Sequence, residues 1–158
     1  MLPKHILQAM QNEATIITPN NRLSEQLLAH YLQASRHKTL PKPTCFAYPS
    51  FLRKTFKQLT TKDIQKHPRL LSDAHIQALW RHIVTPEAEL DTNQNLLNAI
   101  HQAFVICENW GIKYPHPAFQ TTPQTRQFES FRLQFLTQLK TRNAITEHQL
   151  AQYFITNI

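Results

Sequence analysis

The sequence has almost no glycine, and this scarcity excludes two large classes of nucleotide-binding site. Gly111 is the single glycine among 158 residues. Phosphate-binding loops of the G-x-x-x-x-G-K-[ST] and G-x-G-x-x-G types need two or more glycines within a few residues. The chain therefore cannot bind ATP or a dinucleotide through either loop.

Cysteines are also few, and long apolar runs are missing. Cys45 and Cys107 are the only cysteines, and neither belongs to a C-x-x-C pair, so reduced thiols are expected. No run approaches the roughly 18 apolar residues of a membrane span, and the first residues lack the apolar core of a signal peptide. The sequence predicts a cytoplasmic protein with no membrane partner.

Motifs for metal binding and catalysis are missing too. The nine histidines form no H-x-x-x-H or H-E-x-x-H pattern, and no Cys/His pair has zinc spacing. His75 and His82 share a helix face but lie about 10 Å apart along it, too far for one ion to bridge easily. We find no nucleophile elbow and no paired-carboxylate motif. The sequence predicts no cofactor, no metal and no catalytic activity.

Acidic residues are scarce only in the first part of the chain. Residues 1–62 hold nine Lys or Arg and two acids, whereas residues 63–158 hold eight of each sign. The whole net charge of +7 therefore lies in residues 1–62, where it would attract a polyanionic partner. A solvated basic face that keeps the protein soluble explains the same charge, and both interpretations stay open.

The basic region begins with a short helix at 3–12 and then a strand that turns sharply into a helix. β-Branched residues predict the strand at 14–18, which Pro19 ends. Asn20 or Asn21 is expected to cap a helix from about 22 to 35. Its apolar stripe comprises Leu23, Leu27, Leu28 and Tyr31.

The same order of strand, proline and helix then recurs. Residues 44–48 predict a second strand, Pro49 ends it, and Ser50 is expected to cap the next helix. Two neighbouring parallel strands joined by a helical crossover are the natural assembly. The second helix has Phe51, Leu52, Phe56 and Leu59 on its apolar side.

Beyond residue 60 the patterns predict helices and no strand. One helix begins at Ser72, another covers about 93–110 with Gly111 as its left-handed stop, a third covers about 125–141, and 111–124 is a loop. Residues 146–149 have the form of a capping box that opens a last helix. The expected core comprises Ile76, Leu79, Trp80, Ile83, Leu96, Leu97, Ile100, Phe104, Cys107, Trp110, Phe128, Phe131, Phe135 and Leu139.

The predicted fold class is α/β and predominantly helical. A small parallel sheet belongs to residues 1–64, and residues 65–158 form a helical subdomain. Two strands rarely make a stable sheet without further cover. Either helices cover a very small sheet, or the chain is the N-terminal part of a longer protein, which we favour.

Several short motifs, taken in order, resemble the N-terminal region of a bacterial family of probable DNA repair proteins. That family is related to AddB-type nuclease–helicase subunits and carries a PD-(D/E)XK nuclease domain near its C-terminus. The resemblance implies a degenerate P-loop helicase-like fold with an inserted helical subdomain, and it covers nearly the whole chain. The motifs are Thr15 to Leu23, Phe46 to Leu52, Leu70 to Asp73, Gln77 to Trp80, Ala103 with Trp110, and Thr125 to Phe131.

The chain departs from that family at the two places that carry chemistry. A helix without glycine, residues 3–12, stands where active relatives have the P-loop, and the nuclease motif has no counterpart. The resemblance therefore implies a non-catalytic module of a DNA repair or recombination nuclease. Its partners would be DNA, as a single strand or a duplex end, and the C-terminal remainder of the parent protein or a helicase or nuclease subunit.

The resemblance and the charge pattern select the same candidate contacts. The loop that follows the first strand matches the segment that touches single-stranded DNA in superfamily-1 helicases, and basic residues further on would line the same edge. Capping alone also explains the asparagines, and a protein-interaction module or a small stand-alone enzyme remain alternatives. The candidate nucleic-acid-binding residues are Thr18, Asn20, Asn21, Arg22, Lys38, Lys42, Arg53, Lys54 and Lys57.

Overall fold

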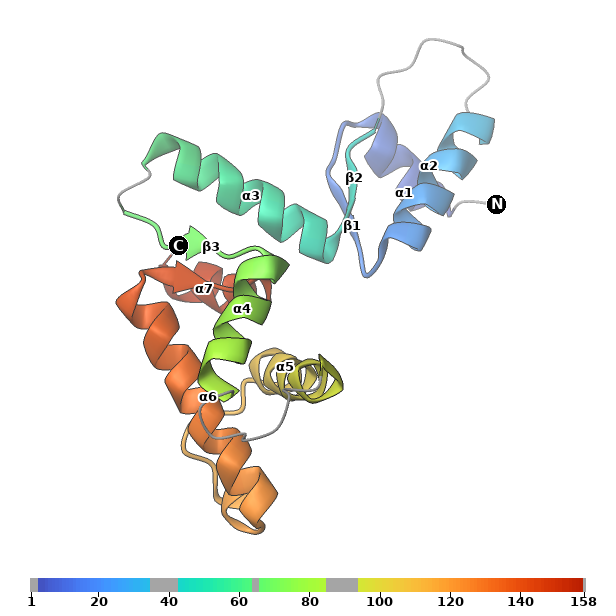
Figure 1. Cartoon of the computed structure of the whole chain (residues 1–158). Coiled ribbons are helices and arrows are strands. Elements are labelled where there is room, and N and C mark those ends of the chain that lie inside the picture. The colour runs from blue at the N-terminus through green and yellow to red at the C-terminus, as the bar shows by residue number, and fades with distance from the viewer. Residues whose placement is uncertain (1–2, 35–42, 64–65, 85–93, 158) are drawn as a thin grey trace. The chain divides into compact units, whose positions relative to one another are not determined.

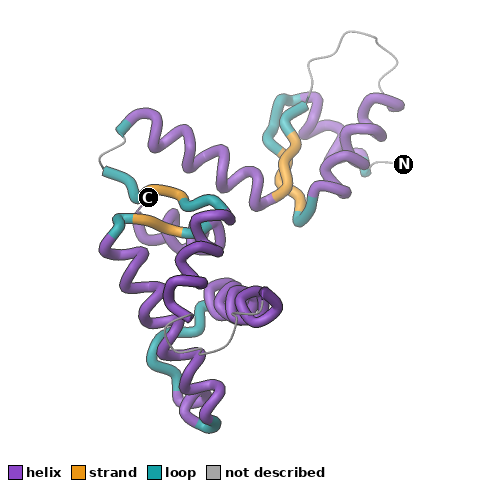
Figure 2. The backbone as a smooth tube through the Cα atoms, viewed as in Figure 1, coloured by secondary structure: helices purple, strands orange, loops and turns teal. Residues whose placement is uncertain are grey.

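The computed structural model of the protein describes residues 3–34, 43–63, 66–84 and 94–157. The chain divides into two compact units, Met1–Lys62 and Asp63–Ile158. Helices predominate, and each unit has one sheet of two short parallel strands (Figure 2). In the described part of the chain, every helix is too short or too polar to cross a lipid bilayer.

The first unit is built on strands β1 (Ile16–Thr18) and β2 (Cys45–Ala47), which lie side by side and parallel (Figure 1). Ile17 is paired with Phe46 at the centre of this sheet, and the backbone N–H of Ile16 donates to the carbonyl of Thr44 at 2.8 Å. The prediction of two neighbouring parallel strands is confirmed. Both are shorter than predicted.

Helices α1 (Lys4–Gln11) and α2 (Asn21–Ala34) pack their apolar sides against one face of this sheet. Met10, Leu27 and Tyr31 form the buried centre, and Ile16 and Cys45 pack against it. The predicted stripe of α2 is correct at these positions. It is wrong at Leu23, which is 38% exposed because it lies in the first turn, away from the centre.

Helix α3 (Tyr48–Lys62) follows β2 without a connecting loop. Tyr48 and Pro49 are therefore helical, and the predictions that Tyr48 ends a strand and that Ser50 caps the helix are wrong. Proline suits the first helical turn because it has no N–H, an N–H at that position would have no acceptor within the helix, and its φ is already helical. Phe56, from the predicted apolar side, is buried.

The second unit is mostly helical, and its helices pack around one core (Figure 1). Trp80 and Phe135 stack with ring centroids 4.0 Å apart, and Phe104 meets both rings edge-on. Most of the predicted core is therefore confirmed. The elements are β3 (Arg69–Leu70), α4 (Asp73–Val84), α5 (Gln94–Asn109), the 3-10 helix η1 (Pro117–Gln120), α6 (Pro123–Thr141), β4 (Ala144–Ile145), the 3-10 helix η2 (Glu147–Gln149) and α7 (Leu150–Asn157).

Two residues expected in this core lie at the surface. Leu96 is 46% exposed and Trp110 is 80% exposed. Successive helical residues are rotated by about 100°, so Trp110 falls roughly 100° from the centre of the buried stripe of α5. It also follows the last residue of that helix. The prediction that Trp110 is core is therefore wrong.

Gly111 ends α5 as predicted, with a φ of +61°. The N–H of Ile112 donates to the carbonyl of Cys107 at 2.9 Å, and the N–H of Gly111 to that of Glu108 at 3.2 Å. These two bonds form a Schellman turn, which requires a left-handed residue. The segment 111–124 is not wholly a loop, because η1 lies within it, and α6 begins two residues earlier than predicted with Thr122 as its cap.

Strands β3 and β4 are parallel neighbours, which the sequence did not predict. Arg69 pairs with Ala144, and the N–H of Leu71 donates to the carbonyl of Ile145 at 3.0 Å. Asn143 has a φ of +45° and turns the chain from α6 into β4. Asparagine tolerates this conformation better than most residues. Each strand has only two residues, too few to show an alternating pattern.

Candidate nucleic-acid interface

The carboxyl edge of the β1–β2 sheet carries the candidate site, because two helices start there. The strands are parallel, so Thr18 and Ala47 end them at the same edge. Helix α2 begins three residues after Thr18, and α3 begins directly after Ala47. Each helix start presents N–H groups without intrahelical partners and a partial positive charge. Ligands of α/β folds commonly bind at such an edge.

Thr18 and Asn20 shape the loop that leads into α2. Thr18 is buried, and its hydroxyl lies 2.9 Å from the carbonyl oxygen of Asn20 and 3.2 Å from that of Phe46, to either of which it can donate. The side-chain oxygen of Asn20 accepts from the N–H of Leu23 at 2.9 Å. Asn20 is therefore the cap of α2. Thr18 is too buried to serve as a surface contact.

Exposed cationic side chains lie on both helices that start at this edge. Asn21 and Arg22 are exposed in the first turn of α2, and Arg53 and Lys54 are exposed in the second turn of α3. Lys54 Nζ lies 4.3 Å from the ring centre of Phe46, which holds the ammonium group over β2 by a cation–π contact.

Three other candidates lie further from this edge or outside the description. Lys57 is exposed, one turn further along α3 than Lys54. Lys38 and Lys42 fall outside the described residues. The structure thus places Asn21, Arg22, Arg53 and Lys54 near the starts of the two helices.

Two residues of this edge were not selected from the sequence. Ser24 is buried, and its hydroxyl donates to the carbonyl of Cys45 at 3.2 Å, which ties α2 to β2. Tyr48 begins α3 and is 46% exposed, so an aromatic ring lies at the same edge as the cations. The sequence would have indicated Tyr48 as a residue of this edge only if the start of α3 had been predicted directly after Ala47.

No protein-family model matches the sequence, and a search of curated proteins finds no match. Within the described ranges, no three His, Cys, Asp or Glu side chains come together closely enough to hold a metal ion. The site is therefore defined by its own geometry and charge.

Two titratable groups of the second unit are shifted by burial. Burial raises the pKa of the Cys107 thiol, which makes it a weak nucleophile at neutral pH. Burial lowers the pKa of His101 below its ordinary 6.5; His148 lowers it further and Asp73 opposes the shift. Trp80 Nε1 donates to His101 Nδ1 at 3.3 Å, and protonation of that nitrogen would remove the acceptor.

We expect the second unit to lose stability as the pH falls below about 6.5. The folded state resists protonation of His101, so the unfolded chain binds more protons in this range and unfolding becomes easier. The contribution of His101 is complete above its ordinary pKa and declines as the pH approaches the lower pKa of the folded state. Urea denaturation at several pH values between 7.5 and 5.0 measures it.

The variant His101→Gln is the control, because its side-chain oxygen can still accept from Trp80 but does not titrate in this range. Its stability should fall less with pH than that of the unaltered chain. Equal pH dependence of the two proteins would contradict a contribution from His101.

Proposed function

We propose that the first unit is a non-catalytic module that contacts single-stranded DNA at the carboxyl edge of its sheet. One observation carries this proposal: two helix starts, the side chains of Arg22, Arg53 and Lys54, and the exposed ring of Tyr48 all belong to that edge. Phosphate groups favour helix starts and guanidinium groups, and bases stack on exposed aromatic rings.

The proposed contacts with the DNA strand come from both α2 and α3. Arg22 and the first N–H groups of α2 would hold one phosphate, and Arg53 and Lys54 the next. Tyr48 would stack on a base, a contact that tolerates any sequence. Binding of this kind depends on contacts with the phosphate backbone of the DNA and has little sequence preference.

The absence of glycine-rich loops supports a role without ATP hydrolysis. We further propose that the chain acts as the helicase-like N-terminal module of a cytoplasmic DNA repair or recombination nuclease. This part rests on the motif resemblance. It assigns DNA and the remainder of such a nuclease as partners, and it leaves catalysis to the latter.

The double variant Arg22→Glu/Lys54→Glu tests the interface. Its affinity for a fluorescent oligothymidylate should fall at least tenfold at 50 mM salt, because each reversal turns an attraction to phosphate into a repulsion. The slope of log affinity against log salt should become shallower by about 1.4, which corresponds to two lost single-strand phosphate contacts at roughly 0.7 each. Fluorescence anisotropy measures both quantities.

The matched control is Lys113→Glu/Arg126→Glu, which changes the net charge equally at exposed positions of the second unit. Circular dichroism should show both double variants folded. If the control loses as much affinity as the test variant, general charge and not this edge is responsible, and the proposed interface is wrong.

A protein-interaction module is the second candidate function, because apolar residues are exposed beside the same edge. Ile17 on β1 is 47% exposed and Leu23 on α2 is 38% exposed. If the unaltered chain binds no oligothymidylate at 50 mM salt, this alternative replaces DNA contact.

A further inference from the structure

A cavity of about 370 Å³ in the second unit is open to solvent and is lined by four exposed nitrogen-bearing side chains together with apolar residues. Arg69, His75, His82 and Arg142 line it, with Leu71 and Leu79 among the apolar residues. Among the residues that the structure describes, no acidic side chain lines it. Arg69 and Arg142 are therefore its charged lining residues.

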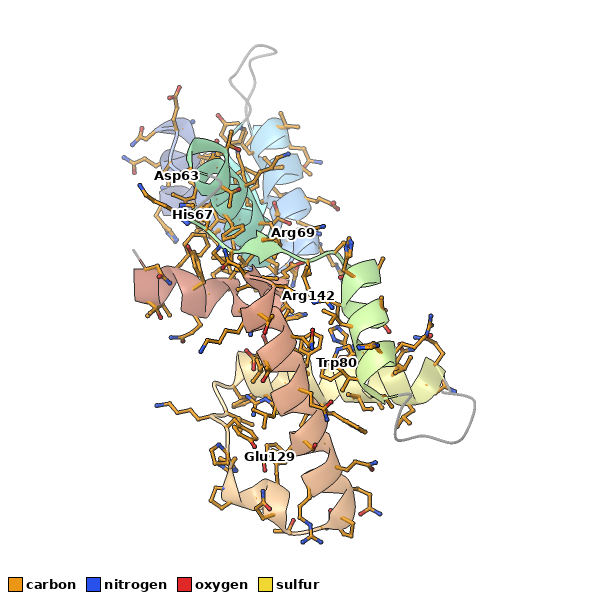
Figure 3. The ribbon with its side chains drawn as sticks, turned by 60° about the vertical axis from the view of Figure 1, so that its left-hand side comes forward. Asp63, His67, Arg69, Trp80, Glu129 and Arg142 are labelled. Atoms are coloured by element: carbon orange, nitrogen blue, oxygen red, sulfur yellow. The ribbon has the colours of Figure 1, made fainter. Side chains whose placement is uncertain are left out.

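The fold brings the two arginines together from distant parts of the chain. Arg69 lies on β3, and its N–H donates to the carbonyl of Asn143 at 2.8 Å. Arg142 caps the end of α6, immediately before Asn143 (Figure 3). In the part of the chain that the structure describes, no carboxylate pairs with either guanidinium group. Arg142 Nε donates to Gln138 Oε1 at 3.3 Å, which leaves its two terminal nitrogens for a ligand.

The two histidines line the cavity from one face of α4. They are separated by two helical turns, about 10 Å, and Ala78 and Leu79 lie between them. The hydroxyl of Ser72 lies 2.7 Å from His75 Nδ1 and holds that ring in place. Imidazole rings can stack on a nucleic-acid base or bond to its edge. The spacing suits one ligand that extends along the helix.

We propose that this cavity binds a nucleoside monophosphate group, with the phosphate between Arg69 and Arg142 and the base along α4 over Leu79. Two guanidinium groups that have no carboxylate partner among the described residues match a phosphate dianion, which accepts paired hydrogen bonds. The volume suits one small ligand of that size. The group belongs either to a free nucleotide or to the phosphorylated end of a DNA strand. The proposal is independent of the first unit.

Calorimetric titration of the full chain with thymidine monophosphate tests it, with thymidine as the ligand that lacks the phosphate. We expect thymidine to bind at least tenfold more weakly. Arg69→Gln/Arg142→Gln should weaken binding of the monophosphate about tenfold or more, since each arginine supplies charge-assisted hydrogen bonds. Arg126→Gln/Lys140→Gln removes the same charge from exposed positions of α6 outside the cavity and should stay within about twofold.

A cavity-filling variant keeps all charges and tests the same site. Ala78 lines the cavity on α4, and Ala78→Leu should weaken binding of the monophosphate about fivefold or more without disturbing the helix. Arg22→Glu/Lys54→Glu in the first unit should leave this binding unchanged, which separates the cavity from the sheet edge.

Two oligothymidylates, with and without a 5′ phosphate, distinguish the sources of the ligand. Measured in Arg22→Glu/Lys54→Glu, which removes the proposed sheet-edge contact, tighter binding of the phosphorylated strand than of the monophosphate supports the proposal with a strand end as ligand. Similar affinities support it with a free nucleotide. The proposal is overturned if the monophosphate and the phosphorylated strand bind no better than their unphosphorylated counterparts, or if the α6 control loses affinity equally.

Discussion

Trp80→Ala is expected to lower the free energy of unfolding of the second unit by about 3–5 kcal/mol. Trp80 is fully buried, and its removal would leave Phe135 without the ring that stacks on it at 4.0 Å and Phe104 without one of its two edge contacts. Domains of this size are stable by roughly 5–15 kcal/mol, so the loss is a large part of the total. Urea denaturation followed by circular dichroism measures it.

The second tryptophan provides the matched control. Trp110 is 80% exposed, and Trp110→Ala should change the unfolding free energy by no more than about 0.5 kcal/mol. Equal losses from the two variants would show that the core is not organised around Trp80.

Glu108→Ala is expected to destabilise the second unit by about 3 kcal/mol, because it removes the only anionic partner described for a buried arginine. Arg132 Nη2 lies 3.2 Å from Glu108 Oε1, and only 4% of the arginine side chain is exposed. The same nitrogen donates to the carbonyl of Ile112, whereas Nε and Nη1 are buried without a described partner. Chemical denaturation of both proteins gives the difference.

Two companion variants identify the cause of that loss. Glu108→Gln keeps an acceptor for Arg132 and should cost less than Glu108→Ala. Glu108→Leu/Arg132→Met removes both charges and should recover most of the stability, because hydrophobic residues often replace a buried ion pair without loss. If the double variant is less stable than Glu108→Ala, an uncompensated charge is not the reason.

The sequence predicted the β1–β2 sheet because its signal is local and repeated. β-Branched residues and a following proline mark 14–18, and a similar pattern marks 44–48. The buried stripes of α4, with Ile76 and Trp80, and of α6, with Phe135, were also predictable, because helical periodicity persists over several turns. These signals need no knowledge of distant contacts.

The errors arise where a distant contact or one backbone turn decides the structure. Strands β3 and β4 exist because two segments far apart in the chain meet, and neither segment shows a strand pattern. The prediction places Tyr48 in the second strand because Pro49 is taken as the strand's end, but α3 begins at Tyr48. The apolar stripe of α5 predicts Trp110 in the core, but this residue follows the last residue of the helix and is 80% exposed.

The candidate site could be predicted in part. The residue types near the helix starts, Asn20 and Arg22, follow from capping and charge patterns, and the cap at Asn20 is present. The burial of Thr18 could not be predicted, because it depends on pairing with β2. The DNA contact itself stays a prediction.

The β3–β4 pairing joins two segments that lie far apart in the chain. Arg69 and Ala144 are about 75 residues apart in sequence, and only two residue pairs join the strands. So short a strand pair can separate while the helices stay folded, because local opening requires less free energy than global unfolding. A molecule bound by both Arg69 and Arg142 would connect β3 to the end of α6 and slow the separation of β3 from β4. It would thereby protect the backbone amides of Arg69 and Leu71 from hydrogen exchange with solvent.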